Sequence, residues 1–278
     1  MAANLARAGF SVAGWNRTPG RPGAHVAADA GVSVVDSAEA AVRGAGIVFT
    51  CLGDEKDVEQ LLAGPNGLCQ LAAEGTLFCD TSTIGREAAR RVGAELKGRG
   101  MRFVDAPVSG GDVGARSGTL TIMAGGERED YEECLPCFEA MGRAVHLCGP
   151  LGSGQAVKMC NQVLFAGHMV ALCEAMRLAE KQGLDQQLIV DVCSSGAAGS
   201  WVLSNLGMKV ASADYAPGFM IKHMAKDLRL IAETAASVGE ELPNTTLAWQ
   251  KFQQVGEMDS GKGGELGTQG VALSYEKQ

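Results

Sequence analysis

The sequence predicts an α/β domain built on a parallel sheet, followed by an all-helical domain. In residues 1–151, short apolar runs alternate with helical patterns, which is typical of strands and helices in a doubly wound sheet. From residue 152 to 278 the pattern is helical and no strand-like run follows. The 278 residues are 46% hydrophobic and 20% charged, which is enough for two domains with sizeable cores.

The first domain is expected to hold six short, apolar strands of the kind that is buried in parallel sheets. They cover residues 10–15, 47–52, 76–80, 102–105, 119–126 and 144–149. The stretches 36–45, 54–64 and 84–100 between them have helical patterns, and Asp36 and Asp54 are expected to cap the first two of these helices.

The second domain is expected to contain helices at 154–182, 185–195, 199–212, 221–238 and 243–259. The first would be roughly 40 Å long, and its centre, MCNQVLFAGHMVALC, is apolar on nearly all sides. A membrane span is the alternative interpretation. Because Asn161, Gln162 and His168 interrupt the run and charges flank it, we predict a central core helix and no membrane.

Charge and cysteine content narrow the function classes. A formal net charge of −8 argues against a nucleic-acid binder. Nine cysteines, mostly scattered through apolar runs, and the absence of an apolar leader at the start predict a cytoplasmic protein with reduced thiols. Cys134 and Cys137 form a CxxC, which we interpret as two cysteines on a helix face rather than a redox or half-zinc motif. The four histidines are dispersed, so no metal site is predicted.

Ligands of parallel sheets bind outside the carboxyl ends of the strands, so the loops after the strands are the candidate sites. Asn16, Arg17 and Thr18 follow the first run. An arginine there suits the 2′-phosphate of NADP, where an acid would hold the ribose hydroxyl of NAD. An ordinary exposed arginine is the alternative.

Two further loops offer hydroxyl groups and unshielded backbone. Ser82 and Thr83 follow the run TLFCD and could contact a ligand or cap a helix. Ser109, Gly110 and Gly111 in DAPVSGG offer a hydroxyl and N–H groups without side chains, which can cradle a carboxylate. A glycine-rich hairpin turn is the alternative.

Lys158 is a cation at the start of a long apolar helix, in GSGQAVKMCNQ. Burial without a purpose would cost several kcal/mol, so we expect this amine to face a cleft between the domains and to donate a proton to a developing alkoxide. Asn161, three residues on, shares its helix face. The alternative is a lysine that reaches out to solvent. Lys222, Lys226 and Asp227 could likewise form only a solvated charged stripe.

These motifs together resemble the β-hydroxyacid dehydrogenase family, in the order NRT, DTSTI, DAPVSGG, GSGQAVKMCNQ and HMAKDLRL. The resemblance implies a Rossmann-type NAD(P)-binding domain and a helical domain that forms homodimers or homotetramers. It also implies roles for single residues. They are Lys158 as catalytic lysine with Asn161 beside it, Ser109, Gly110 and Gly111 as the carboxylate loop, Phe219 and Asp227 as lining of the far side of the site, and Thr83 and Lys226 as cofactor contacts.

The resemblance implies hydride transfer from NADPH to a small semialdehyde or 2-oxo acid, such as tartronate semialdehyde, succinic semialdehyde or glyoxylate. NAD-dependent 3-hydroxyisobutyrate dehydrogenation is the alternative within the class, and a non-catalytic dimeric scaffold is the alternative outside it. Imine reductases share much of this fold, but Lys158 argues against that activity.

Two departures from the family pattern matter. Gln162 stands where the family has a second asparagine, which would change how the lysine is held. The family also opens with a strand and a GxGxxG-type loop, whereas MAANLARAGF matches the helix after that loop. We therefore expect roughly 14 to 16 further residues upstream, and weak NADPH binding and low stability without them. Equal stability and cofactor affinity in a version extended upstream in frame would contradict this.

Overall fold

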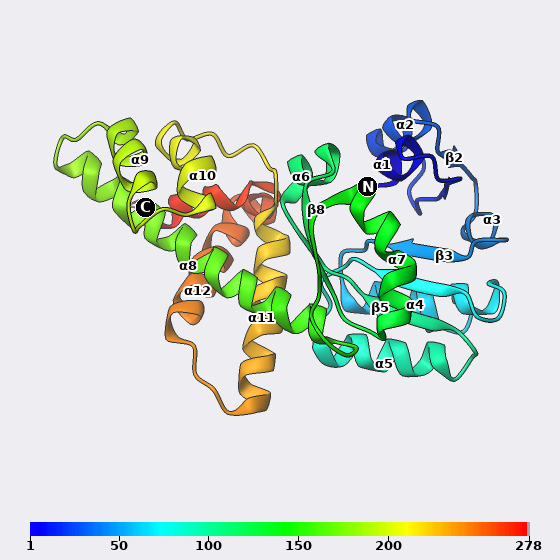
Figure 1. The fold of residues 1–278 in the computed structure, drawn as a ribbon. Coiled ribbons are helices and arrows are strands. Elements are labelled where there is room, and N and C mark those ends of the chain that lie inside the picture. Colours follow the sequence, from blue (N-terminus) through cyan, green and yellow to red (C-terminus); the bar gives the residue numbers. More distant parts are fainter. Residues whose placement is uncertain (277–278) are drawn as a thin grey trace. The chain divides into compact units, whose positions relative to one another are not determined.

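The computed structural model describes residues 1–276, and the chain divides into two compact units. The first runs from Met1 to Lys158 and the second begins at Met159 (Figure 1). The first is an α/β unit and the second is helical, as the sequence predicts.

The first unit holds its strands in three hydrogen-bonded groups. The central group is parallel, in the order β3, β4, β5. In a second group β7 pairs parallel with β8 and antiparallel with β6, and a third pairs β1 with β2. The strands are β1 Ala13–Gly14, β2 Ser33–Val34, β3 Ile47–Thr50, β4 Leu77–Asp80, β5 Arg102–Asp105, β6 Val108–Ser109, β7 Leu120–Ala124 and β8 Gly142–Leu147.

The single predicted sheet is therefore interrupted. Within residues 1–276, no ladder joins β1 or β2 to β3, and only the bridge between Asp105 and Gly125 joins β5 to the end of β7. That bridge has two short backbone hydrogen bonds, of 3.0 Å and 2.7 Å. The register aligns Thr50, Asp80 and Asp105, so three polar residues end three adjacent strands at one edge.

Helices of the first unit cover both faces of the central strands (Figure 1). Phe78 and Phe103 point into one apolar cluster with Leu96 of α5, while Cys79 and Val104 point into the other with helix α7. This alternation follows from the period of two along a strand. The helices are α1 Ala2–Arg7, α2 Pro22–Asp29, α3 Ala38–Val42, α4 Glu55–Ala63, α5 Arg86–Lys97, α6 Gly111–Ser117 and α7 Arg128–Met141.

Two local predictions have different outcomes. Asp36 does not cap helix α3, because Ser37 takes that position and its hydroxyl accepts the Ala40 N–H at 3.1 Å. The cap expected at Asp36 is therefore wrong by one residue. Cys134 and Cys137 lie in helix α7 and are buried in the core, which is the helix-face arrangement that we predicted.

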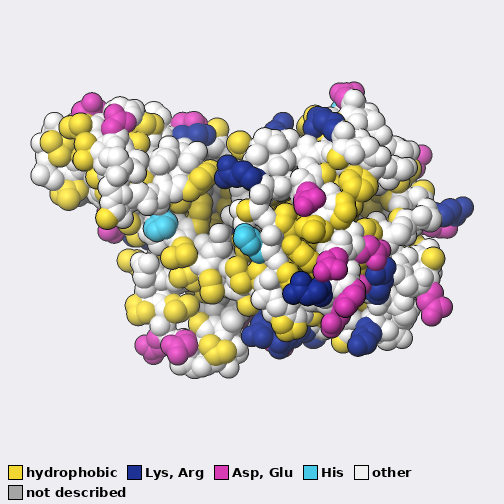
Figure 2. Space-filling view, viewed as in Figure 1, with side chains coloured by type: hydrophobic (Ala, Val, Ile, Leu, Met, Phe, Trp, Pro, Cys, Tyr) yellow, Lys and Arg dark blue, Asp and Glu magenta, His cyan; other side chains and the backbone are white. Residues whose placement is uncertain are grey.

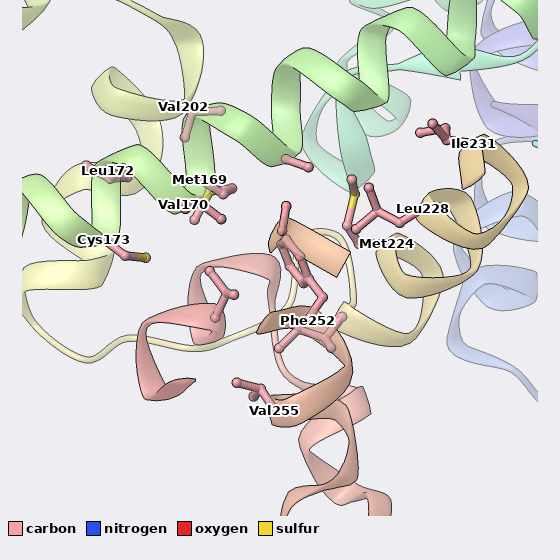
Figure 3. Packing of buried hydrophobic residues seen from close by; sticks show 14 of the residues in the cluster. Met169, Val170, Leu172, Cys173, Val202, Met224, Leu228, Ile231, Phe252 and Val255 are labelled. Atoms are coloured by element: carbon pink, nitrogen blue, oxygen red, sulfur yellow. The ribbon is translucent and has the colours of Figure 1, made fainter. Parts of the chain in front are cut away.

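The second unit packs around helix α8, which begins in the first unit (Figure 3). Met169 and Cys173 of α8 lie in one cluster with Met224 and Leu228 of α11 and with Phe252 of α12. The elements are α8 Ser153–Lys181, α9 Gln186–Ser195, α10 Trp201–Ala211, α11 Ile221–Val238, α12 Pro243–Glu257, and the 3₁₀ segments η2 Met258–Glu265 and η3 Thr268–Tyr275.

Helix α8 has one buried and one exposed apolar face. It is long and apolar enough to cross a membrane by length and composition alone, and 44% of its apolar window is buried. The other face carries Leu164 and Leu178, which are 61% and 62% exposed. Apolar side chains are visible on the surface of both units, and charges of both signs intermingle on the first unit (Figure 2).

Candidate active site

Lys158 lies in the first turns of α8, and its side chain is not directed into bulk water. The residue is only 6% exposed, and its Nζ donates a hydrogen bond to the Val108 carbonyl at 2.9 Å. Val108 immediately precedes Ser109. The structure therefore places the amine beside the loop that the sequence proposes as a carboxylate cradle.

The cradle depends on glycine geometry. Ser109 ends β6, and Gly110 and Gly111 follow with φ values of 131° and 62°. Side chains rarely adopt these positive angles, so glycine is required there. The two glycines are exposed and Ser109 is partly buried, which leaves a hydroxyl and two unshielded N–H groups for an anionic ligand.

Asp105 anchors the start of the helix that carries Lys158. Its carboxylate accepts the Gly152 N–H at 2.6 Å and the Gln155 N–H at 2.8 Å, and the residue is fully buried. Burial raises the pKa of Asp105 to about 6, while these two hydrogen bonds and its own backbone N–H oppose the rise. Sequence reasoning noticed the motif DAPVSGG but not this role of its first residue.

Gln155, also missed from the sequence, ties the same helix to the loop after β4. Its Oε1 accepts the N–H groups of Ile84 and Gly85 at 3.0 Å and 3.2 Å. Its Nε2 donates to the Ser82 carbonyl at 2.8 Å, and the residue is fully buried. The available signal was a polar side chain three residues before Lys158, on the inward face of an apolar helix.

The loop after β4 holds Thr83 in a fixed frame. The Ser82 hydroxyl donates to Asp80 at 2.7 Å and accepts the Leu52 N–H at 2.8 Å, which links this loop to the one after β3. Thr50 donates to the same Asp80 oxygen at 2.7 Å. Thr83 itself is partly buried, between Ser82 and the residues that Gln155 holds.

The loop after β1 is exposed and polar. Asn16 donates to the Thr18 carbonyl at 2.9 Å, which keeps the turn compact. Arg17 is 79% exposed in its side chain and forms an ion pair with Asp57 of α4 at 3.3 Å. The guanidinium therefore lies near the start of the helix that follows β3, with an acidic neighbour that sequence reasoning did not anticipate.

In the second unit, three residues predicted for the site and Gln162 form one network of hydrogen bonds and an ion pair. Asn161 donates to Gln162 at 2.8 Å, and Gln162 donates to the buried Asp227 carboxylate at 2.6 Å. Lys226 pairs with the other oxygen of Asp227 at 2.7 Å. Because a carboxylate only accepts, Gln162 must present its NH₂ group to Asp227 and its oxygen to Asn161.

Phe219 lies just before α11, and its ring stacks on His223 with centroids 6.1 Å apart. Burial, and then the nearby charges of Lys222 and Lys226, lower the pKa of His223. The neutral imidazole is therefore favoured near neutral pH, and it faces the Phe219 ring.

Two family models together match most of the chain. The first unit matches the model for the NAD-binding domain of 6-phosphogluconate dehydrogenase over residues 1–149. Residues 152–271 match the model for the NAD-binding region of NADP-dependent 3-hydroxyisobutyrate dehydrogenase.

Individual relatives span nearly the whole chain. An uncharacterized oxidoreductase of Synechocystis sp. is 49% identical over 277 residues, which is 100% of this chain and 94% of that protein. The 2-hydroxy-3-oxopropionate reductase of Escherichia coli is 34% identical, over 91% of this chain and 85% of that protein. A structure of Mycobacterium tuberculosis 3-hydroxyisobutyrate dehydrogenase with L-serine superposes with a TM-score of 0.86 at 33% identity, covering 99% of this chain and 94% of that chain.

The chain belongs to the β-hydroxyacid dehydrogenase family and is an NAD(P)-dependent oxidoreductase. The residues present fit a nicotinamide dinucleotide. Arg17 offers an exposed cation, and Asn16, Thr18 and Thr83 offer polar groups, in loops that follow parallel strands.

Proposed function

We propose that this dehydrogenase uses NADPH in preference to NADH, and that it reduces a small semialdehyde or 2-oxo acid to the hydroxy acid. Tartronate semialdehyde, succinic semialdehyde and glyoxylate are the candidate substrates. The observation that carries the proposal is the position of Lys158. Its amine is buried and 2.9 Å from the carbonyl that directly precedes the Ser109–Gly110–Gly111 loop.

The residues of the first unit account for binding and proton transfer. Ser109, Gly110 and Gly111 hold the substrate carboxylate through the hydroxyl and backbone N–H groups. A bound nicotinamide cofactor supplies the hydride. Lys158 then gives a proton from Nζ to the alkoxide oxygen, so that reduction yields a neutral alcohol and leaves a neutral amine that solvent reprotonates. In the reverse direction the neutral amine takes the alcohol proton.

The residues of the second unit have supporting roles in this proposal. Asn161, whose NH₂ group is held by Gln162, presents its oxygen as an acceptor for a cation or a hydroxyl. Phe219 supplies apolar surface to the substrate pocket, and Asp227 acts there through its hydrogen bond to Gln162. Lys226 and Thr83 are proposed as cofactor contacts.

NADPH preference rests on Arg17. Its guanidinium is exposed after a parallel strand, and a planar cation with several donors suits a 2′-phosphate. The second candidate is NAD-dependent 3-hydroxyisobutyrate dehydrogenation. It is favoured by the Arg17–Asp57 ion pair, since a carboxylate beside the arginine competes with a phosphate, and by the similarity to the Mycobacterium tuberculosis enzyme.

A matrix of substrates and cofactors tests both candidates. Initial rates are measured for the three aldehydes or oxo acids with NADPH and NADH, and for 3-hydroxyisobutyrate and L-serine with NADP⁺ and NAD⁺. The proposal expects the highest kcat/KM for an aldehyde or oxo acid with NADPH. A highest value for 3-hydroxyisobutyrate with NAD⁺ would establish the second candidate instead.

We also infer assembly as a homodimer or homotetramer in the cytoplasm, with small carboxylates rather than nucleic acids or membranes as partners. The exposed apolar side chains of α8, such as Leu164 and Leu178, support self-association because water contact with them is unfavourable. None of the nine cysteines, all within residues 1–276, is in a disulfide, which suits a reducing compartment. Sedimentation equilibrium would show a monomer if the assembly is wrong.

A further inference from the structure

Gln155 and Asp105 hold the first turn of α8 at two separate points of the first unit. Asp105, at the end of β5, accepts backbone N–H groups of Gly152 and Gln155. The Gln155 side chain binds Ser82, Ile84 and Gly85 in the loop after β4. Both residues are fully buried, so water does not compete for these bonds.

The two attachments lie next to Lys158, the proposed proton donor, and next to the loop of Thr83, the proposed cofactor contact. The reaction requires a fixed distance between these two parts. Gln155 lies one helical turn before Lys158 on the same helix, so the two side chains emerge from the same face. Thr83 lies between Ser82 and Ile84, both of which Gln155 holds. A shift of the helix start would therefore move the lysine and release the loop.

We propose that Gln155 and Asp105 are positioning residues that fix the Lys158 amine relative to the loop of Thr83, and that Gln155 couples the two. This inference rests on the proposed role of Lys158 as proton donor. Neither side chain takes part in the chemistry itself. Their effect comes through placement, and an error of about 1 Å in a reacting group can cost about 100-fold in rate.

The proposal predicts different effects for substitutions of the two residues, because Asp105 contacts only the helix start and Gln155 also contacts the loop of Thr83. Asp105 bonds to the helix but not to the loop of Thr83, so Asp105→Asn should lower kcat about 10- to 100-fold and leave the Kd for NADPH within about twofold. Gln155 bonds to both, so Gln155→Leu should lower kcat similarly and also raise the Kd for NADPH about tenfold. The leucine would leave two N–H groups and one carbonyl without partners.

A conservative replacement separates positioning from general damage. Gln155→Glu keeps an acceptor for the N–H groups of Ile84 and Gly85 but cannot donate to Ser82 when ionised. We expect its effects to fall between those of the wild type and Gln155→Leu. Gln182→Leu and Asp191→Asn are matched controls, because both residues are exposed and lie outside this arrangement.

The experiment measures kcat, its pH profile and NADPH affinity by fluorescence titration, with folding of each variant checked by circular dichroism. Displacing the amine from the Val108 carbonyl should change the alkaline limb of the kcat profile in Asp105→Asn and Gln155→Leu, because the amine then loses that partner. A purely structural role would lower the melting temperature and leave this limb and the NADPH Kd unchanged.

The outcomes distinguish this inference from the proposed function. If Lys158→Ala abolishes turnover while kcat and its pH profile are unchanged in folded Asp105→Asn and Gln155→Glu, the positioning role is wrong and the proposed function stands. If Lys158→Ala keeps substantial turnover, the proposed proton donor is wrong and this inference falls with it. If Gln155→Leu does not fold, the kcat and pH profiles of Gln155→Glu and Asp105→Asn still show whether the positioning role is right.

Discussion

Lys158 shows how a buried cation is accommodated at the scale of a single residue. An ammonium that leaves water loses several kcal/mol of solvation unless it gains partners. At 6% exposure, Lys158 gains the Val108 carbonyl at 2.9 Å. Its surroundings therefore hold the amine beside Ser109, and the side chain does not extend into solvent.

Arg17 should determine the preference for NADPH over NADH. Replacing Arg17 with Asp removes the cation and adds a group that suits the ribose hydroxyl of NAD. We expect the ratio of kcat/KM for NADPH to that for NADH to fall by about tenfold or more, since a charged hydrogen bond contributes about 1.5–3 kcal/mol. Steady-state kinetics with both cofactors measure this ratio, and an unchanged ratio would remove Arg17 from the 2′-phosphate site.

Ionisation of Asp105 should make the free energy of unfolding depend on pH. Its pKa is about 6 in the folded protein, against an ordinary value of 3.8 for aspartate, mainly because of burial, with a smaller contribution from the charge of Asp80. The folded state therefore holds this proton more tightly, so stability is highest below pH 4 for this group and is lost as the pH rises through 6. The loss is about 3 kcal/mol.

Urea denaturation of the wild type and Asp105→Asn at several pH values isolates this contribution. The unfolding free energy of the wild type, relative to that of the variant, should decline by about 2 kcal/mol from pH 4 to pH 7, because part of the total loss already falls below pH 4. A difference that stays constant over this range would contradict the raised pKa.

Some site residues could be found from the sequence and others could not, for a physical reason. Lys158 and the loop of Ser109 stand in compact motifs whose composition already points to chemistry. The roles of Asp105 and Gln155 depend on partners 50 and 71 residues away in the chain, so no local pattern reveals them. The Arg17–Asp57 pair, across 40 residues, was missed for the same reason.

At the scale of elements, helix α8 was predicted closely because a long apolar run leaves few other structures open. It spans Ser153–Lys181 where 154–182 was expected. No element was predicted after the helix at 243–259, yet η2 and η3 pack there and Val271 is fully buried. The turn in η2 needs positive φ at Asp259, Ser260 and Gly261, a combination that single-residue propensities do not signal.

Gly154 is needed because the start of α8 passes very close to other backbone. A Cβ built there would lie 2.1 Å from the Met123 carbonyl oxygen and 2.9 Å from that of Asp105. Backbone atoms in two strands cannot move aside cheaply, so Gly154→Ala should destabilise by about 3 kcal/mol or more.

Thermal unfolding measures this effect, and the melting temperature should fall by roughly 5–10 °C. Gly23→Ala is the matched control, since a Cβ there meets nothing within 4 Å and helix α2 favours alanine over glycine. Similar melting temperatures for the two variants would show that the start of α8 has more room than the structure indicates.

At the scale of the whole molecule, the sequence correctly predicted an α/β unit followed by a helical unit, because strand–helix alternation stops once and does not return. It did not predict that the strands form three hydrogen-bonded groups, since ladders depend on which strands are neighbours. The order along the chain does not report this. The residues predicted for the site fall in both units of the chain, with Lys158 and the carboxylate loop in the first and Asp227 and Phe219 in the second.

Turnover of Lys158→Ala, measured together with its nicotinamide cofactor affinity, tests the central claim most directly. If Lys158 protonates the nascent alcohol, kcat should fall at least about 100-fold, in the range that general acid catalysis supplies, while the Kd for the cofactor stays within about twofold. Substantial remaining turnover, with the cofactor bound as in the wild type, would show that the proton comes from elsewhere.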